Sequence, residues 1–209
     1  IKPVDKGVRN TLLWIAGFIS LMLGLLMAGY LMPRSLTVEQ FRELGFYRFE
    51  TPRVIGDFNL VDHTGSAVGL DDLKGRWSLL FFGFTFCPDI CPTTLSVLND
   101  VVGKLENPPQ VVMVSVDPER DTPDKLADYV PAFNSTFRGF TGEFDEVVSL
   151  ATQVNIAFGK VPGPELGTYL IGHTASNVVV NPAAGYEGFI KAPHNAQNIQ
   201  RILNDLTPP

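Results

Sequence analysis

An uninterrupted run of twenty uncharged residues, Leu12 to Leu31, sets the strongest limit on how this 209-residue chain can fold. As an α-helix, about 20 apolar residues cross the roughly 30 Å hydrocarbon core of a bilayer. Trp14 and Tyr30 lie near the two ends of the run, where amphipathic rings prefer the membrane interface. We therefore expect a transmembrane helix over residues 12–32, after a short N-terminal segment of residues 1–11.

The charges that flank this run predict its orientation. Lys2, Lys6 and Arg9 precede it, whereas only Arg34 follows closely. By the positive-inside rule the N-terminus stays in the cytoplasm and everything after Pro33 is exported. The expected location is a bacterial inner membrane, single pass, with the C-terminal domain in the periplasm; the mitochondrial inner membrane and intermembrane space are the alternative. A cleaved signal peptide competes with this interpretation, but the run is longer than the about 7–15 apolar residues typical of one.

Small residues recur every fourth position along the run, at Ala16, Ser20, Gly24 and Ala28. Such a stripe lets a second membrane helix approach closely. Small residues are also frequent in any membrane helix, so the stripe is equally consistent with no helical partner.

The rest of the chain is acidic and long enough for one domain. From residue 35 onward it carries 12 Lys and Arg against 21 Asp and Glu, a net charge of about −9. Phosphate backbones select basic surfaces, so a nucleic-acid partner is not expected. We expect a juxtamembrane connector over residues 33–52 and a single domain over residues 53–209.

Strand-like and helix-like segments alternate after the connector, which predicts an α/β fold with helices on both faces of a sheet. A buried central strand is expected at Leu79–Phe84, which is apolar on both faces. Gly and Pro are frequent in Gly159–Thr168, which we expect to be a loop over the site. The other expected strands are Ile55–Leu60, Ala67–Leu70, Gln110–Val116, Phe137–Phe140, Tyr169–Ile171 and Ala175–Asn181, the last two forming a pair. The expected helices are Ser35–Phe49, Thr93–Leu105, Pro123–Phe133, Glu143–Phe158 and Asn195–Leu206.

The only two cysteines, Cys87 and Cys91, follow the central strand and open the next helix. Four-residue spacing places them on one helix face, one turn apart. At about 6 Å between Cα atoms they could form a disulfide or bind one soft metal ion. A helix N-terminus beside them should stabilise both thiolates and lower their pKa.

Four segments carry a family resemblance: Gly83–Pro92 around the cysteines, Val116–Pro123, Tyr169–Thr174 around His173, and Asn181-Pro182 with Gly185. Together they resemble the Sco/SenC family of membrane-anchored copper proteins. The resemblance implies a thioredoxin-like fold after the anchor, with copper held by Cys87, Cys91 and His173. It further implies a role at the CuA site of cytochrome c oxidase subunit II. Gly172 departs from the family, in which an acidic residue is usual before the histidine.

Two thiolates and an imidazole suit Cu(I), and the imidazole lets the site hold Cu(II) as well. Zinc is the main rival metal; a structural zinc site needs four ligands, and Asp121 could supply the fourth. Otherwise Asp117 and Asp121 are expected to orient the site or to dock a partner, with capping of the helix that begins at Pro123 as the alternative.

Three functions remain open at this point. The first is a copper chaperone that delivers copper to the CuA site, reduces its cysteines, or does both. The second is a thiol–disulfide oxidoreductase without an obligatory metal, and the third is a copper or redox sensor. A peroxidase is disfavoured because its activating threonine should stand three residues before the cysteine, where this chain has Phe84.

Overall fold

The computed structural model describes residues 6–31, 35–163, 165 and 167–208, and it divides into two compact units, Ile1–Ser35 and Leu36–Pro209. The described residues do not include three that were used to predict the orientation of the membrane helix: Lys2, Pro33 and Arg34. They also do not include the side chains of Ala28 and Tyr30.

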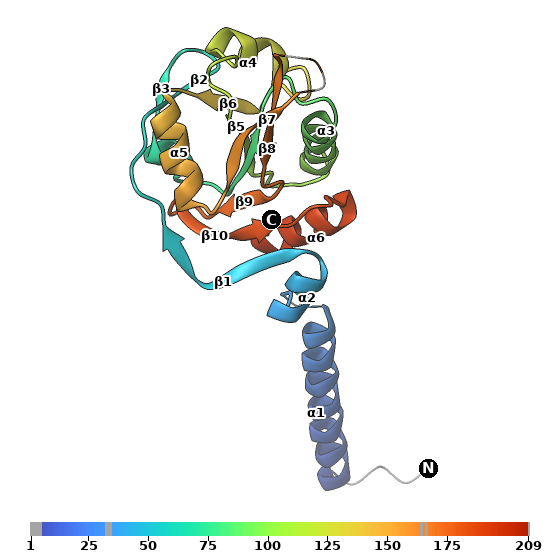
Figure 1. The fold of residues 1–209 in the computed structure, drawn as a ribbon. Coiled ribbons are helices and arrows are strands. Elements are labelled where there is room, and N and C mark those ends of the chain that lie inside the picture. Colours follow the sequence, from blue (N-terminus) through green and yellow to red (C-terminus); the bar gives the residue numbers. More distant parts are fainter. Residues whose placement is uncertain (1–5, 32–34, 164, 166, 209) are drawn as a thin grey trace. The chain divides into compact units, whose positions relative to one another are not determined.

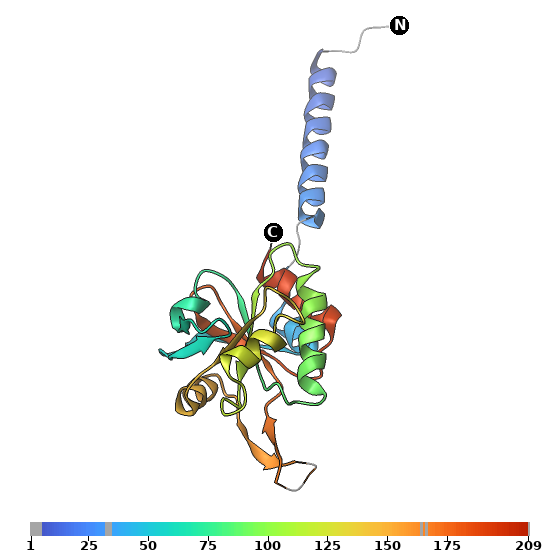
Figure 2. The same ribbon diagram turned by 90° about the horizontal axis from the view of Figure 1, so that it is seen from above.

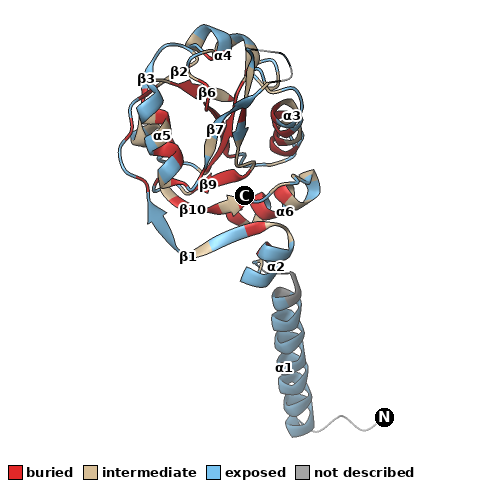
Figure 3. Cartoon of the chain, viewed as in Figure 1, coloured by how far each residue is buried: buried red, intermediate tan, exposed pale blue. Residues whose placement is uncertain are grey.

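The first unit is one helix, α1 (Lys6–Leu31). Within it Lys6–Met27 has a mean hydropathy of 1.9, so α1 is long and apolar enough to cross a membrane. Its described side chains are exposed (Figure 3). The expected apolar helix is therefore confirmed, and it begins six residues earlier than Leu12. Ala16, Ser20 and Gly24 lie along it, and their contact with another membrane helix stays a prediction.

The second unit is built on an eight-stranded mixed sheet with the strand order β1-β10-β9-β4-β5-β6-β2-β3 (Figure 1). The parallel strands β4, β5 and β6 form its middle, and the strands on both sides run antiparallel. The strands are β1 (Phe46–Val54), β2 (Leu60–Asp62), β3 (Ala67–Val68), β4 (Ser78–Gly83), β5 (Gln110–Ser115), β6 (Arg138–Thr141), β9 (Asn177–Val180) and β10 (Gly185–Ile190).

The core lies on the central strands. Every residue of β4, β5 and β9 is buried, as expected for strands covered on both faces. Helices α3 (Ile90–Val102) and α6 (Ala196–Leu206) lie on one face and α5 (Phe144–Gln153) on the other (Figure 1). Two shorter helices, α2 (Val38–Glu43) and α4 (Pro123–Tyr129), and the 3-10 turn Leu70–Leu73 complete the unit.

Strands β4 and β5 determine where the site forms. They pair in parallel from Ser78 opposite Gln110 to Gly83 opposite Ser115, so both end at the same level. The loops that follow them therefore emerge side by side, as is usual for ligand sites at the carboxyl ends of parallel strands.

A separate two-stranded sheet stands beside the main one. It is an antiparallel hairpin of β7 (Phe158–Pro162) and β8 (Tyr169–His173). In Figure 2 this orange hairpin projects from the body of the unit. The hairpin shows that two predictions are wrong. Gly159–Thr168 is not wholly a loop, and β8 pairs with β7 and not with the segment after His173.

The segment after the anchor also differs from expectation. Helix covers only Val38–Glu43, where Thr37 and Gln40 form a capping box. The next residues form the edge strand β1, and the compact unit begins at Leu36 and not at residue 53. Ile55 and Phe58 are buried but do not form the expected strand, which begins only at Leu60.

The remaining predicted elements are confirmed with shifted ends. Helix α3 begins at Ile90 and not at Thr93. Its first turn can contain Pro92, because a backbone N–H in the first turn has no partner within the helix and proline therefore loses no hydrogen bond there. Helix α5 ends at Gln153 and not at Phe158; Asn155 has a φ of 58°, which no helix accommodates. Helix α6 begins one residue later than expected, at Ala196, because the Asn195 side chain caps it by accepting from Asn198 N.

Candidate metal centre

The cysteines lie where the central strand β4 passes into α3. Cys87 is half-buried in the connecting loop, and Cys91 is the second residue of α3 and fully buried; both are free thiols. Gly83 allows this close packing, since a Cβ there would stand 2.6 Å from the Phe81 ring and 3.1 Å from Cys91 Sγ. Strand, loop and helix therefore hold the pair at the carboxyl end of the sheet.

The hairpin brings His173 to the cysteines from 82 residues away. Its Nε2 lies 3.8 Å from Cys91 Sγ, and its Nδ1 lies 3.2 Å from the carbonyl oxygen of Thr174. The ring stands edge-on to the rings of Phe81 and Phe84, with centroids 6.4 and 6.2 Å away. When Nδ1 donates to that carbonyl, Nε2 presents its lone pair to the cysteine side.

The two sulfurs differ in acidity. The pKa of Cys87 is lowered to about 4, chiefly by the Cys91 thiol, which hydrogen-bonds to its sulfur, with His173 assisting. The backbone N–H of Cys91, free at the helix N-terminus, also donates to Cys87 Sγ at 3.4 Å. The neighbouring Cys87 sulfur and burial raise the pKa of Cys91. The expectation that both pKa values fall is correct for Cys87 and wrong for Cys91, because two adjacent thiols do not both ionise readily.

The donor set fits a soft metal ion. With a metal–sulfur bond of about 2.3 Å and a metal–nitrogen bond of about 2.0–2.1 Å, two ligands of one ion stand about 3.6–3.8 Å apart. The Cys91–His173 separation lies in this range. Among the described residues no group of three or more His, Cys, Asp or Glu side chains is placed to hold a metal ion. Cys91 contacts both Cys87 and His173, so it is the residue that joins the three proposed donors.

Asp117 connects the loop after β5 to the histidine hairpin. Its carboxylate is 2% exposed; it accepts hydrogen bonds from Tyr169 Oη at 3.0 Å and from Arg120 Nε. Its own N–H donates to Ser115 Oγ. Asp117 therefore supports β8 through these hydrogen bonds.

Asp121 connects the same loop to the cysteine loop. Its buried carboxylate accepts hydrogen bonds from Thr85 N and Oγ1, at 3.0 and 2.6 Å, and from Ser115 Oγ at 2.7 Å. Burial raises its pKa, although these donors act in the opposite direction. Thr122, not Asp121, caps α4, because its side chain accepts from Lys125 N. With its oxygens so occupied, Asp121 is a poor candidate for a fourth zinc ligand.

Sequence reasoning missed the side chain that joins these parts, Arg120. It lies between the rings of Phe86 and Tyr169, which are 83 residues apart in sequence. The only available signal was its place inside the Val116–Pro123 motif. Of the other histidines, His63 accepts a hydrogen bond at Nδ1 from Gly139 N. Burial lowers the pKa of His194, whose ring nitrogens have no hydrogen-bond partner among the described residues.

The fold and this arrangement define a thioredoxin-like protein with paired cysteines and a histidine at the carboxyl end of its sheet. The model of the family described as SCO1/SenC matches residues 48–207, and the chain belongs to this family. A relative from Stutzerimonas stutzeri named "Putative copper-binding protein" is 34% identical over 98% of this chain and 97% of its own length. The chain spans a little over half of the mitochondrial SCO2 homologues of mouse and human, 58% and 56%.

Solved structures of relatives agree with this membership. Arabidopsis thaliana ScoI, solved with copper bound, is 32% identical and has a TM-score of 0.66, over 69% of this chain and 92% of that one. BsSco, described as a member of the Sco family of cytochrome c oxidase assembly proteins, is 24% identical and has a TM-score of 0.58, over 78% and 99%. At that identity BsSco supports the fold alone.

Proposed function

We propose that this chain is a membrane-anchored copper chaperone that acts on the CuA site of cytochrome c oxidase subunit II. The single observation that carries the proposal is the meeting of the three soft donors. Cys91 Sγ lies 3.8 Å from His173 Nε2, and the backbone N–H of Cys91 donates to Cys87 Sγ at 3.4 Å. Copper-bound relatives and the family membership support the choice of copper over zinc.

The three residues have distinct roles in this proposal. Cys87 is a thiolate at neutral pH and the more exposed sulfur, so it is the donor that an incoming partner reaches first. Cys91 loses its proton on binding copper and supplies the buried sulfur. His173 supplies the nitrogen that a Cu(II) ion favours. Copper is cargo here, passed by exchange of these ligands for the cysteines of the acceptor.

The same pair also supports a second function, reduction of the acceptor's disulfide. The Cys87 thiolate attacks one sulfur of that disulfide, and the other sulfur leaves as a thiolate. Cys91 then loses its proton and attacks Cys87 Sγ, which releases the second acceptor sulfur and closes a Cys87–Cys91 disulfide. The low pKa of the half-buried Cys87 beside a protonated Cys91 favours this chemistry. A peroxidase gains no support, since Thr85 Oγ1 donates to Asp121 and not to Cys87.

The place of action follows from α1. We propose that α1 crosses the inner membrane once, with the N-terminus in the cytoplasm and the copper domain in the periplasm. The excess of Lys and Arg before the helix supports this orientation. Subunit II presents its metal site on the same side in this scheme.

The test is metal analysis of the full chain in detergent. We expect one copper per chain and, with Cu(II), a visible thiolate-to-copper charge-transfer band. His173→Ala should weaken Cu(II) binding and shift the band. His63→Gln is the matched control, because His63 bonds to Gly139 of β6 and has no contact with the cysteines or His173 among the described hydrogen bonds. Equal spectra for the parent and His173→Ala would defeat the ligand assignment.

Delivery and reduction are separated with the soluble acceptor domain. Transfer of copper to its reduced form, measured in each protein after separation, supports the chaperone. Loss of the disulfide of its oxidised form without copper, measured by thiol counting, supports the reductase.

A further inference from the structure

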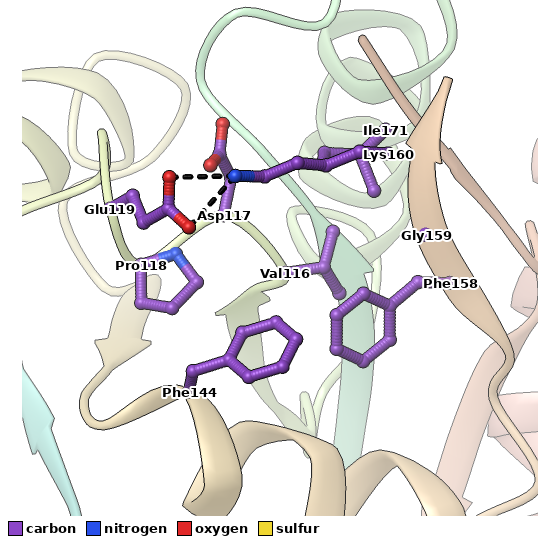
Figure 4. Close-up of a pocket in the computed structure, with 9 residues that line it drawn as sticks. All are labelled: Val116, Asp117, Pro118, Glu119, Phe144, Phe158, Gly159, Lys160 and Ile171. Atoms are coloured by element: carbon purple, nitrogen blue, oxygen red, sulfur yellow. Dashed lines mark hydrogen bonds and ion pairs between the residues drawn. The ribbon is translucent and has the colours of Figure 1, made fainter. Parts of the chain in front are cut away.

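The histidine hairpin has little support from the core on one side. Among the described strands, β7 and β8 pair only with each other. Beside them is a cavity of about 290 Å³, and Figure 4 shows the rings of Phe144 and Phe158 next to each other in its lining. Its lining is completed by Val116, Asp117, Pro118, Glu119, Gly159, Lys160 and Ile171. Ile171 of β8 is buried in the core, but the cavity leaves this side incompletely packed, so polar contacts add to the support of β8.

Polar contacts at the start of β8 provide the attachment. The side chains of Asp117 and Arg120 bond to each other, and both reach Tyr169. Asp117 accepts from Tyr169 Oη, and Arg120 Nη1 donates to the Tyr169 carbonyl oxygen at 3.3 Å. The guanidinium carbon of Arg120 also lies 3.8 Å from the centre of the Tyr169 ring. Tyr169 is thus held through ring, hydroxyl and backbone, four residues before His173.

Arg120 contacts the cysteine side directly. Its guanidinium carbon lies 4.7 Å from the centre of the Phe86 ring, and Phe86 directly precedes Cys87. A planar guanidinium can stack on rings while it donates hydrogen bonds in its plane, which a lysine cannot do. Lys125 also contacts the Phe86 ring, with Nζ 5.4 Å from its centre, but shows no contact with the hairpin among the described contacts.

We propose that Arg120 is a positioning residue that sets the distance between His173 and the cysteine pair. It does so by joining Phe86 of the cysteine loop to Tyr169 of the histidine hairpin, with Asp117 fixing its orientation. Only the expected effect of Arg120 on copper binding rests on the proposed function. The positioning itself is a property of the metal-free protein, and it is tested there first.

The first test needs no metal. In the parent protein the His173 ring protons should be shifted by ring currents, because Phe81 and Phe84 stand edge-on to the imidazole. In Arg120→Gln these shifts should move toward values of an unstructured histidine. Lys125→Gln, the matched control on the same Phe86 ring, should keep the parent shifts. Arg120→Lys retains the charge but loses the planar guanidinium, so its His173 ring shifts should lie between those of the parent and of Arg120→Gln.

Removal of Arg120 leaves Asp117 buried without its cation, so Arg120→Gln could unfold the domain. The double variant Asp117→Asn with Arg120→Gln removes that charge and keeps the experiment decisive. Its backbone amide signals for β4 and β5 should match those of the parent, whereas the His173 signals should not. Parent-like His173 ring shifts in the folded double variant would overturn the proposal.

The second test uses Cu(I) and Cu(II) separately. Loss of residues that orient a metal ligand typically weakens binding about 10–100-fold. We expect Arg120→Gln to weaken Cu(II) binding by this amount and to lose the imidazole nitrogen coupling in its electron spin-echo spectrum. Cu(I) binding, which two thiolates suffice for, should be unchanged.

The two proposals fail in different ways. If His173→Ala binds Cu(II) like the parent, the ligand assignment fails, and the metal-free shifts still decide the role of Arg120. If His173→Ala loses Cu(II) affinity while Arg120→Gln retains both affinity and nitrogen coupling, the ligand assignment stands and the positioning role is overturned.

Discussion

The cysteine half and the histidine half of this site are held in the molecule in different ways. The cysteines follow β4, all of whose residues are buried, and Cys91 itself is fully buried. His173 ends a hairpin that lies outside the main sheet and beside a cavity (Figures 2 and 4). One half is fixed by the hydrophobic core, and the other combines a smaller core contact through Ile171 with several polar contacts. The comparison predicts that His173 can move away from the cysteines while the domain stays folded.

The largest expected effect tests that difference with one substitution at two places. Leu80→Ala in β4 should lower the free energy of unfolding by about 2–5 kcal/mol, because it leaves a cavity in the core. Leu170→Ala in β8, at a half-buried position, should cost about 1 kcal/mol. Urea unfolding of both variants provides the measurement. Equal losses would mean that the hairpin belongs to the core as fully as β4 does.

The next prediction concerns the cysteine half and pH. The pKa of Cys87 is lowered to about 4 in the folded protein, whereas the unfolded thiol keeps its ordinary value of 9.0. Between these values the unfolded state binds one proton more, so this group makes stability rise with pH and its contribution is lost as pH falls through 4. Thiolate absorbance at 240 nm should persist in the folded protein to about pH 4, and Cys87→Ser should abolish it and flatten the rise in stability. Absorbance that appears only above pH 8 would contradict the assignment.

A smaller effect should appear in the histidine half. Tyr169→Phe keeps the ring beneath Arg120 and removes only the hydrogen bond to Asp117. Loss of about 1 kcal/mol of local stability should speed hydrogen exchange of the β7 and β8 amides about 5-fold and leave β4 and β5 unchanged. Uniform acceleration across both sheets would show that the hairpin does not open independently.

The smallest effect is expected at the outer contact of the hairpin. Lys160 Nζ lies 2.7 Å from Glu119 Oε2, but both side chains are exposed, so the attraction is screened by solvent. Lys160→Met should leave the urea midpoint and the His173 ring shifts within error of the parent. A clear change in either quantity would show that this ion pair, and not Arg120, holds the hairpin in place.

The sequence predicted the cysteine half better than the histidine half, for a physical reason. Strand β4 and helix α3 are adjacent in sequence and have strong apolar patterns, so their order and the position of Cys91 could be inferred. Strand β7 contains Gly159 and ends at Pro162, a composition that indicates a loop. Its pairing with β8 depends on cross-strand contacts that no local pattern reveals.

The edge strand β1 was missed for a related reason. Most of its residues are exposed, so it lacks the alternation that marks a half-buried strand. Asp117 and Asp121 were singled out from the sequence, but their hydrogen-bond partners could not be predicted. Thr85 lies 36 residues from Asp121, and Tyr169 lies 52 residues from Asp117. Their contacts arise only once the loops after β4 and β5 stand side by side.

The equal ending of β4 and β5 has a consequence for how this chain can vary in length. Val116 N donates to Gly83 O at 2.9 Å, so the loops after β4 and β5 both begin at this hydrogen bond. An inserted residue in either loop would displace the aromatic or acidic side chains that meet across them. Gains and losses of residues should instead be tolerated at exposed bends remote from those two loops, such as residues 106–108. Lineages of this domain should therefore differ in size at those bends while the two loops keep a constant count.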